Sequence, residues 1–368
     1  MKTVCKENTC VGCMLCAEIC PVDAITVNDG MKAYNAVIDE TKCISCNACF
    51  SKCQNNHAPS FSSALSWQQG WANDEAVRNR STSGGIASAL ILKMLETGGV
   101  VCSCAFKDGN FSFLFCETKD ELPHYAGSKY VKSNAFGVYK KIASLLRSGR
   151  KVLFVGLPCQ VGALRMYLSP ALQENLIAVD LICHGTPAPK TLDLYLQQYE
   201  SSLDSSTTIS FRQKHTFSVK TDSLKGLTGK TDEYMLGFLE GLYYTDNCYE
   251  CKYAQRNRVG DITLGDSWGS ELPQEERLKG VSLIGCTTEK GRDFLNQCDI
   301  TLLDVDCELA FKHNGQLNRP SLKPKNREKF FNCIAKGKKF NSAVFSCLPK
   351  KCLKQKVKRV AFLLGLKK

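Results

Sequence analysis

Short stretches of alternating apolar and polar residues along the chain predict two pairs of β-strands. In each pair the two stretches flank a turn that is rich in Asn, Asp and Gly. The stretches are residues 24–27 and 36–38 around a turn at 28–30, and residues 100–106 and 111–117 around a turn at 108–110.

Longer apolar segments in the middle of the chain predict a buried α/β body. Residues 151–156 form a continuous apolar run, residues 161–167 have a helical pattern, and residues 176–183 form a second apolar run. Strand, loop, helix and strand in this order predict two parallel strands joined by a crossover helix. Four further elements complete a mixed α/β body over residues 67–310: helices at 86–96 and 139–147, and strands at 208–211 and 261–264.

The composition of the 368-residue chain supports a hydrophobic core and argues against a membrane span. Hydrophobic residues make up 43% of the chain and charged residues 23%, which are ordinary values for a globular protein. No apolar run approaches the roughly 18–20 residues that a bilayer crossing needs. The chain has 22 cysteines, and its first residues lack the apolar core of an export signal. We therefore expect a cytoplasmic protein whose cysteines stay reduced.

Positive charge is concentrated in residues 311–368, which we expect to form a basic tail. The segment contains 17 Lys and Arg residues and one acidic residue, whereas the whole chain has a net charge of +12. Four apolar residues recur in it at helical spacing among lysines: Leu353, Val357, Val360 and Leu364. Such a helix favours peripheral contact with the anionic inner face of a membrane. A solvated tail and a helix packed on the acidic body are the alternatives, and we expect no nucleic-acid partner from this charge alone.

Eight cysteines fall into two copies of one spacing, offset by 33 residues. In each run, two residues separate the first three cysteines from one another, and three residues separate the third cysteine from the fourth. The runs are Cys10, Cys13, Cys16 and Cys20, then Cys43, Cys46, Cys49 and Cys53. Bacterial two-cluster ferredoxins have this spacing, and the fourth cysteine of each run ligates the cluster of the other run. We therefore assign Cys53 to the first cluster and Cys20 to the second. A disulfide framework or a zinc site fits this spacing less well.

These cysteines predict a ferredoxin-type domain with two [4Fe–4S] clusters over residues 1–57, followed by a polar connector at 58–66. Pro21 follows the first run, as in the ferredoxin pattern, but Gln54 occupies the equivalent place after the second run. Cys5, upstream of the first run, is a spare thiol. Because such clusters are sensitive to oxygen, we expect an anaerobic or microaerobic setting.

Four further cysteines lie near predicted strand ends or in a CxxC motif: Cys159, Cys183, Cys248 and Cys251. Loops that leave the carboxyl ends of neighbouring parallel strands converge in one crevice, so these thiols are candidates for a third [4Fe–4S] cluster. A zinc or dithiol site at the CxxC motif is an alternative, as is simple packing of the strand-end cysteines.

The order of motifs in residues 3–310 resembles the coenzyme F420 hydrogenase/dehydrogenase beta-subunit family. Besides the ferredoxin cysteines, the resemblance rests on Ser83-Gly84-Gly85, Gly127-Ser128-Lys129-Tyr130 and four longer segments. These are VLFVGLPCQ at 152–160, LICHGTPAPK at 181–190, CYEC at 248–251 and GDITLGDSWG at 260–269.

This resemblance implies one FAD in the α/β body, with the third cluster beside it on the four cysteines named above. The flavin would contact Ser83, Gly84 and Gly85 and the segment Gly127, Ser128, Lys129 and Tyr130. Glycines that open a helix let backbone N–H groups approach a pyrophosphate, although without the resemblance an ordinary helix cap with a tight turn is the favoured interpretation of the first motif. Asp266 and Trp268 are candidates for lining the pocket, with a place in the core as the alternative for Trp268. His184 is a candidate for a hydrogen-bonding role beside a cluster cysteine.

The sequence therefore predicts an iron–sulfur flavoprotein oxidoreductase with a mixed α/β flavin-binding body. It would pass electrons between its [4Fe–4S] clusters and an organic substrate or an F420-like deazaflavin through FAD. A low-potential electron carrier is the expected protein partner. The alternative is a non-catalytic electron-transfer subunit of a larger redox complex. The sequence identifies no catalytic acid or base.

Overall fold

The computed structural model describes residues 2–204, 207–226 and 231–364. Its N-terminal part is a small domain with one antiparallel strand pair, β1 (Ile25–Asp29) and β2 (Tyr34–Ile38), and two short helices, α1 (Leu15–Ile19) and α2 (Ala48–Ser51). The strand pair was predicted, but its turn begins at Gly30, whose N–H donates to the carbonyl of Ala33 at 3.0 Å. The turn is displaced because the Asp29 carboxylate accepts the N–H of Met31 at 2.8 Å.

The body is built on one eight-stranded mixed sheet. Its order is β12-β3-β11-β10-β7-β6-β4-β5, and the strands from β10 to β4 run parallel. The bounds are β3 Ser66–Ala72, β4 Val100–Lys107, β5 Asn110–Cys116, β6 Val152–Gly156, β7 Leu176–Leu181, β10 Ile262–Asp266, β11 Ser282–Cys286 and β12 Ile300–Asp304. The parallel pair β6–β7 and the hairpin β4–β5 are as predicted. Strands β3, β11 and β12, which extend one edge by antiparallel pairing, were not predicted from the sequence.

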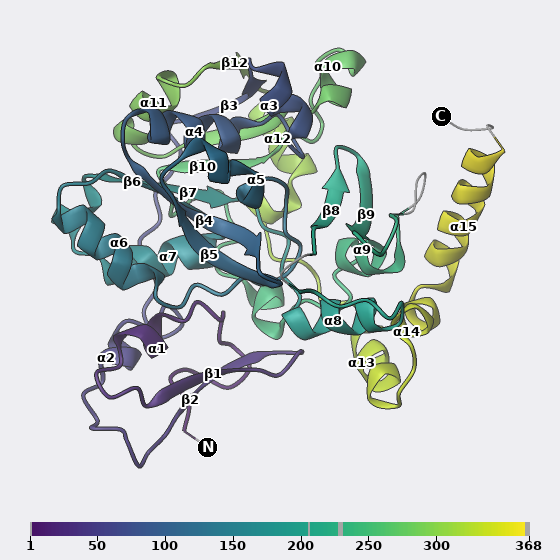
Figure 1. Ribbon diagram of the computed structural model, residues 1–368, viewed down its shortest axis with the longest axis horizontal. Helices are drawn as coiled ribbons and strands as arrows, with labels where there is room; N and C mark the ends of the chain where they lie inside the picture. The colour runs from purple at the N-terminus through teal and green to yellow at the C-terminus, as the bar shows by residue number, and fades with distance from the viewer. Residues whose placement is uncertain (1, 205–206, 227–230, 365–368) are drawn as a thin grey trace.

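Helices cover both faces of this sheet (Figure 1). Along β4 and β6, alternate residues enter two different hydrophobic clusters, as the pleat requires. Val101 and Leu153 join α4 (Ile86–Glu96) and α11 (Glu289–Asn296) in one cluster. Cys102 and Phe154 join α6 (Val138–Arg147) and α7 (Pro158–Tyr167) in the other. The shorter helices of this body are α3 (Glu75–Arg80), α5 (Leu122–Tyr125), α10 (Gln274–Lys279) and α12 (Cys307–His313).

A third hydrophobic cluster shows that much of the basic segment is folded. It joins α8 (Pro189–Gln197), the strand pair β8 (Ile209–Gln213) and β9 (Thr216–Thr221), α9 (Glu233–Leu239), α13 (Arg327–Ala335) and α14 (Phe340–Cys347). Phe330 and Phe340 are among its most buried side chains. The helices α13 and α14, which lie in the segment expected to be a basic tail, therefore belong to the folded body, because their aromatic residues complete this core.

The last helix, α15 (Pro349–Leu363), extends away from the body (Figure 1). Its apolar residues Leu353, Val357 and Val360 are each more than half exposed. Among the described residues, no helix is both long and apolar enough to cross a membrane.

Candidate functional site

The two ferredoxin-type cysteine runs repeat in backbone conformation as well as in sequence. Gly12 and Met14 in the first run have positive φ angles of 68° and 66°, and Ser45 and Asn47 in the second have 57° and 58°. In each run a short helix follows at once. These left-handed residues curl the chain, so that backbone N–H groups turn toward sulfur, as where Gly12 donates to Cys10 Sγ at 3.4 Å.

The fourth thiol of each run lies close to a thiol of the other run. The neighbouring Cys5 thiol and burial raise the pKa of Cys53 most. The nearby thiol of Cys13 raises the pKa of Cys53 further. Burial raises the pKa of Cys49, and the neighbouring thiols of Cys20 and Cys46 raise it further. The fourth cysteine of each run therefore lies near a cysteine of the other run, and the crossed ligand assignment stays a prediction.

The small domain is fixed to the body by charged hydrogen bonds. Glu18, which is 3% exposed, accepts the N–H groups of Gly137 at 3.0 Å and Tyr139 at 3.3 Å at the start of α6. A buried carboxylate at a helix N-terminus is stabilised by the free N–H groups and by the helix dipole. Nearby, Tyr139 Oη donates to the Cys13 carbonyl at 2.6 Å, and Lys132 Nζ donates to the Val11 carbonyl at 2.8 Å.

The body brings its own four candidate cysteines into one region. Cys159 lies in the first turn of α7 rather than in the preceding loop, Cys183 follows β7, and Cys248 and Cys251 lie in and just after a 3₁₀ turn at Asp246–Glu250. Burial raises the pKa of Cys159, and Cys251, Cys183 and Cys248 all raise it further. Cys248 Sγ also accepts the N–H of Thr186 at 3.4 Å.

The four cysteines place four thiol donors in one region of the body. Among the described residues, no group of three or more His, Cys, Asp or Glu side chains is arranged to hold one metal ion. A cubane binds its thiolates at separate iron corners, so its ligands stand farther apart than those of a single zinc ion. The donor set also contains only thiols, which is the ligand type of such clusters.

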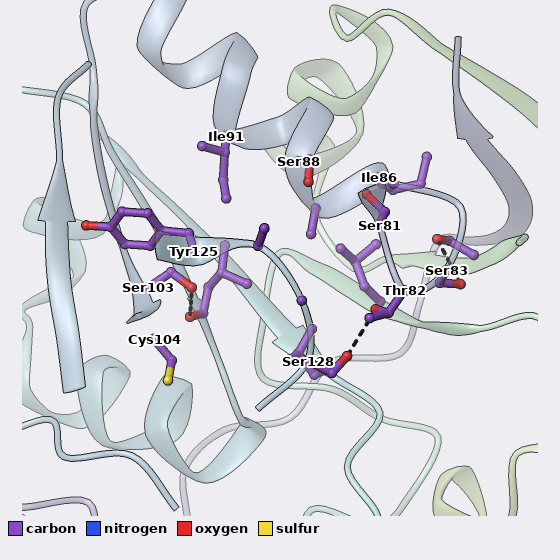
Figure 2. A pocket seen from close by; sticks show the side chains of 18 of the residues that line it. Ser81, Thr82, Ser83, Ile86, Ser88, Ile91, Ser103, Cys104, Tyr125 and Ser128 are labelled. Carbon is purple, nitrogen blue, oxygen red and sulfur yellow. Dashed lines mark hydrogen bonds between the residues drawn. The ribbon is translucent and has the colours of Figure 1, made fainter. Parts of the chain in front are cut away.

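A cavity of about 1660 Å³ reaches from the start of α4 to this cysteine set. Figure 2 shows its hydroxyl-rich end, where Ser81, Thr82 and Ser83 precede α4 and Ser128 faces them from the opposite loop. Thr82 Oγ1 and Ser128 Oγ are 3.0 Å apart. The other end is lined by Cys183.

Six of the seven predicted flavin contacts line the cavity: Ser83, Gly85, Gly127, Ser128, Lys129 and Tyr130. Gly84 does not. A Cβ atom on Gly84 would lie 2.4 Å from the Gly70 carbonyl oxygen and 2.8 Å from the Ser282 nitrogen. The absence of a side chain at Gly84 therefore serves the packing of the turn against β3 and β11. Gly85 has a φ of 90°, which explains the glycine there.

Lys129 places a cation at the wall of the cavity. Its Nζ donates to the carbonyls of Tyr125 at 2.8 Å and Ala126 at 3.0 Å. Burial lowers the pKa of Lys129 to about 8, because a charged ammonium loses hydration there. The lysine is therefore charged at neutral pH and becomes neutral in mildly alkaline solution.

The predicted pocket residues Asp266 and Trp268 also line the cavity, together with an arginine that the sequence analysis missed. Arg212 donates two hydrogen bonds to Asp266, at 2.7 and 2.9 Å, and its guanidinium lies 5.6 Å from the centre of the Trp268 ring. Only the approach of β8 to the end of β10 reveals this pair, since the residues are far apart in sequence. His184 lines the cavity too, and burial lowers its pKa.

Comparisons with known proteins agree with this architecture. The family models for the coenzyme F420 hydrogenase/dehydrogenase beta subunit match residues 68–140 with their N-terminal part and residues 149–303 with their C-terminal part. A 4Fe–4S dicluster domain matches residues 9–57. No curated protein matches the chain.

Among solved structures, a chain of the F420-reducing [NiFe] hydrogenase complex from Methanosarcina barkeri, studied by xenon derivatization, has a similar fold. The TM-score is 0.50 at 19% sequence identity, and the match covers 70% of this chain and 90% of the other. Taken with the family models, these findings show that the chain belongs to the coenzyme F420 hydrogenase/dehydrogenase beta-subunit family and carries a 4Fe–4S dicluster domain.

Proposed function

We propose that this protein is an iron–sulfur flavoprotein oxidoreductase that transfers electrons between [4Fe–4S] clusters and an organic substrate through FAD. The observation that carries the proposal is the continuity of the cavity. One space is lined by the helix-opening turn at Ser83 and Gly85 and by Cys183 of the body's cysteine set. A flavin in this space would lie beside a cluster, as such transfer requires.

The residues at the hydroxyl-rich end fit the phosphates of FAD. Helix α4 has 11 residues, and no side chain caps its N-terminus, so its first N–H groups are free to bind an anion. Thr82 and Ser128 supply hydroxyl groups, and Lys129 supplies positive charge. Bound FAD would supply the exchange between one-electron and two-electron chemistry.

The residues of the body's cysteine set fit a third [4Fe–4S] cluster. Cys159, Cys183, Cys248 and Cys251 would be its ligands, and the N–H of Thr186 would tune it through its hydrogen bond to Cys248. The partners would be a low-potential electron carrier at the ferredoxin-type domain and an organic molecule, such as an F420-like deazaflavin, in the cavity.

Turnover by the purified chain distinguishes this proposal from a non-catalytic electron-transfer subunit. The protein is purified anaerobically, and its iron, sulfide and flavin are quantified. F420, nicotinamides and reduced ferredoxin are then each offered as electron donors to the protein alone. Bound FAD with reduction or oxidation of a small molecule supports the enzyme. Bound FAD without such turnover favours the subunit role, and absence of flavin after reconstitution contradicts the proposal.

Helix α15 supports a peripheral location at the inner face of the cytoplasmic membrane. It carries six basic residues and no acidic ones: Lys350, Lys351, Lys354, Lys356, Lys358 and Arg359. An exposed apolar face with dense positive charge is suited to the headgroup region of an anionic bilayer. A second copy of the same helix is a poorer partner, because the two positive charges repel.

A further inference from the structure

Gln54 departs from the ferredoxin pattern, and it lies between the ferredoxin-type domain and the body's cysteine set. It follows cluster cysteine Cys53, and its side chain is 2% exposed. Gln54 Nε2 donates to the carbonyl of Cys159 at 2.9 Å, while its Oε1 accepts the hydroxyl of Tyr253. The Gln54 carbonyl accepts Lys252 Nζ at 2.8 Å.

These three contacts reach two of the three segments that hold the body's cysteine set. Cys159 is itself a member of the set, and Lys252 and Tyr253 directly follow Cys251. The Gln54 side chain also lies beside the thiol of Cys13 in the ferredoxin-type domain. One amide side chain thus touches candidate ligands of two different clusters.

Tyr253 fills the remaining space at this contact. It is 3% exposed, and its ring lies 5.5 Å from that of Phe61. A Cβ atom on Gly162 would come within 2.3 Å of the Tyr253 hydroxyl oxygen, so α7 passes directly against the tyrosine. The Tyr253 hydroxyl is within electrostatic range of Cys159 and Cys13. Tyr253 is therefore closely packed between α7 and Phe61.

The other end of the ferredoxin-type domain is different. Pro21, the equivalent of Gln54, is exposed, and proline has no side-chain group for a hydrogen bond. Cys46 is also exposed. Ile44 and Phe50 in the same cysteine run are 60% and 51% exposed. One cysteine set therefore faces the body, and the other faces solvent.

We propose that Gln54 and Tyr253 are positioning residues that couple the set Cys10, Cys13, Cys16 and Cys53 to the set Cys159, Cys183, Cys248 and Cys251. The set Cys20, Cys43, Cys46 and Cys49 is then the outer one, open to an external electron carrier. This inference rests on the proposed third cluster. An electron crosses between clusters without any bond changing, and its rate falls steeply as the gap widens or loses packed atoms. Hydrogen bonds around ligands also set cluster potentials.

The test compares Gln54→Leu with Pro21→Leu, which introduces the same side chain at the equivalent exposed position. Tyr253→Phe, which keeps the ring and removes the hydroxyl, is the mild variant if Gln54→Leu is unstable. Each full-length protein is reconstituted anaerobically, and its iron is counted. The reduced proteins are examined by electron paramagnetic resonance for the magnetic interaction between clusters. Rapid mixing with a reduced carrier then measures how fast reduction reaches the body's cluster.

We expect Gln54→Leu and Tyr253→Phe to keep the wild-type iron content, change the interaction signal and slow the transfer about 10-fold, whereas Pro21→Leu leaves both unchanged. A wild-type protein with only two clusters would contradict the third cluster and this inference together. A wild-type protein with three clusters whose Gln54→Leu and Tyr253→Phe variants match Pro21→Leu would overturn this inference alone.

Discussion

At the scale of single residues, the structure shows that two glycines of one motif have different roles. Gly84 and Gly85 are adjacent, yet Gly84 permits close packing of the turn against β3 and β11, while Gly85 adopts a left-handed conformation at the cavity. Substituting Gly84 would therefore disturb the sheet before it affected a ligand. Lys129 and the CxxC cysteines offer cleaner tests, because their side chains reach the cavity or the cysteine set.

The charge of Lys129 predicts a pH dependence of flavin binding. The pKa of this lysine is lowered to about 8 by burial, so its positive charge is present at pH 7 and is lost as the pH rises through 8. Affinity for FAD should fall over this interval, because the cation no longer attracts phosphate. Lys129→Arg should bind FAD equally well at pH 7 and above pH 8, since arginine stays charged. Lys129→Met should bind FAD weakly in both conditions. Fluorescence titration with FAD measures these affinities, and a wild-type affinity independent of pH would contradict the role.

Replacing Cys248 and Cys251 together by serine tests the third cluster directly. The wild-type protein should contain about twelve irons after anaerobic reconstitution, and the double variant about eight. The signals of the ferredoxin-type clusters should remain, because their cysteines lie on a separate domain. Cys307→Ser, at a cysteine outside all three sets, is the control. An iron content near eight in the wild type, unchanged in the double variant, would eliminate the third site.

At the scale of elements, α15 differs from the preceding helices α13 and α14 in how much of its apolar surface is buried. α13 and α14 complete an aromatic core, whereas α15 contacts the body mainly near its beginning, where Cys352 is buried. The Lys351 ammonium pairs there with Glu240. The apolar residues farther along the helix remain exposed, and the proposed membrane contact rests on this exposure.

We expect α15 to attach the protein to anionic vesicles in a salt-sensitive manner. Each basic residue near such a surface contributes about 1 kcal/mol, and burial of the apolar side chains adds to this. The full-length protein should float with vesicles containing anionic lipid at low salt. The chain truncated after Pro349 and the variant Val357→Glu should not float. Leu322→Glu changes an apolar residue that is 70% exposed outside the helix, and it should behave as wild type. Equal flotation of all four proteins would rule out this attachment.

At the scale of the whole molecule, the ferredoxin-type domain and the body are joined by a few strong contacts. Glu18 supplies the carboxylate that the start of α6 lacks, because the capping residue of that helix is Gly137. Gln54 and Lys132 add contacts beside the cysteines. The position of the ferredoxin-type cysteines relative to the body therefore depends on the docking of these two parts.

Loss of the Glu18 carboxylate should weaken this docking. Hydrogen bonds to charged groups contribute about 1.5–3 kcal/mol each, so Glu18→Ala should lower the free energy of unfolding by at least one such contribution. Hydrogen exchange at the first turn of α6 should increase, while β1 and β2 stay protected. Glu7→Ala, at an exposed residue of the same domain, is the control. Unchanged exchange in α6 would show that Glu18 is not needed for docking.

The sequence alone determined the features that depend on neighbours close in the chain. Cysteines two and three residues apart identify a cluster loop because one short loop must supply the ligands. The helix at Ile86–Glu96, the hairpin of β4 and β5 and the parallel pair β6–β7 follow from local apolar periodicity and turn residues. The motifs in order indicated the family, which the family models confirm.

Tertiary structure alone decided which distant residues meet. β3 pairs with β11 and β12 across more than 200 residues, and no local pattern specifies such a partner. The Arg212–Asp266 pair in the cavity wall and the Gln54–Tyr253 contact between the modules arise in the same way. Hydrophobic burial acts without direction, so the sequence indicates which segments are buried. Their neighbours are chosen only when all the elements pack together.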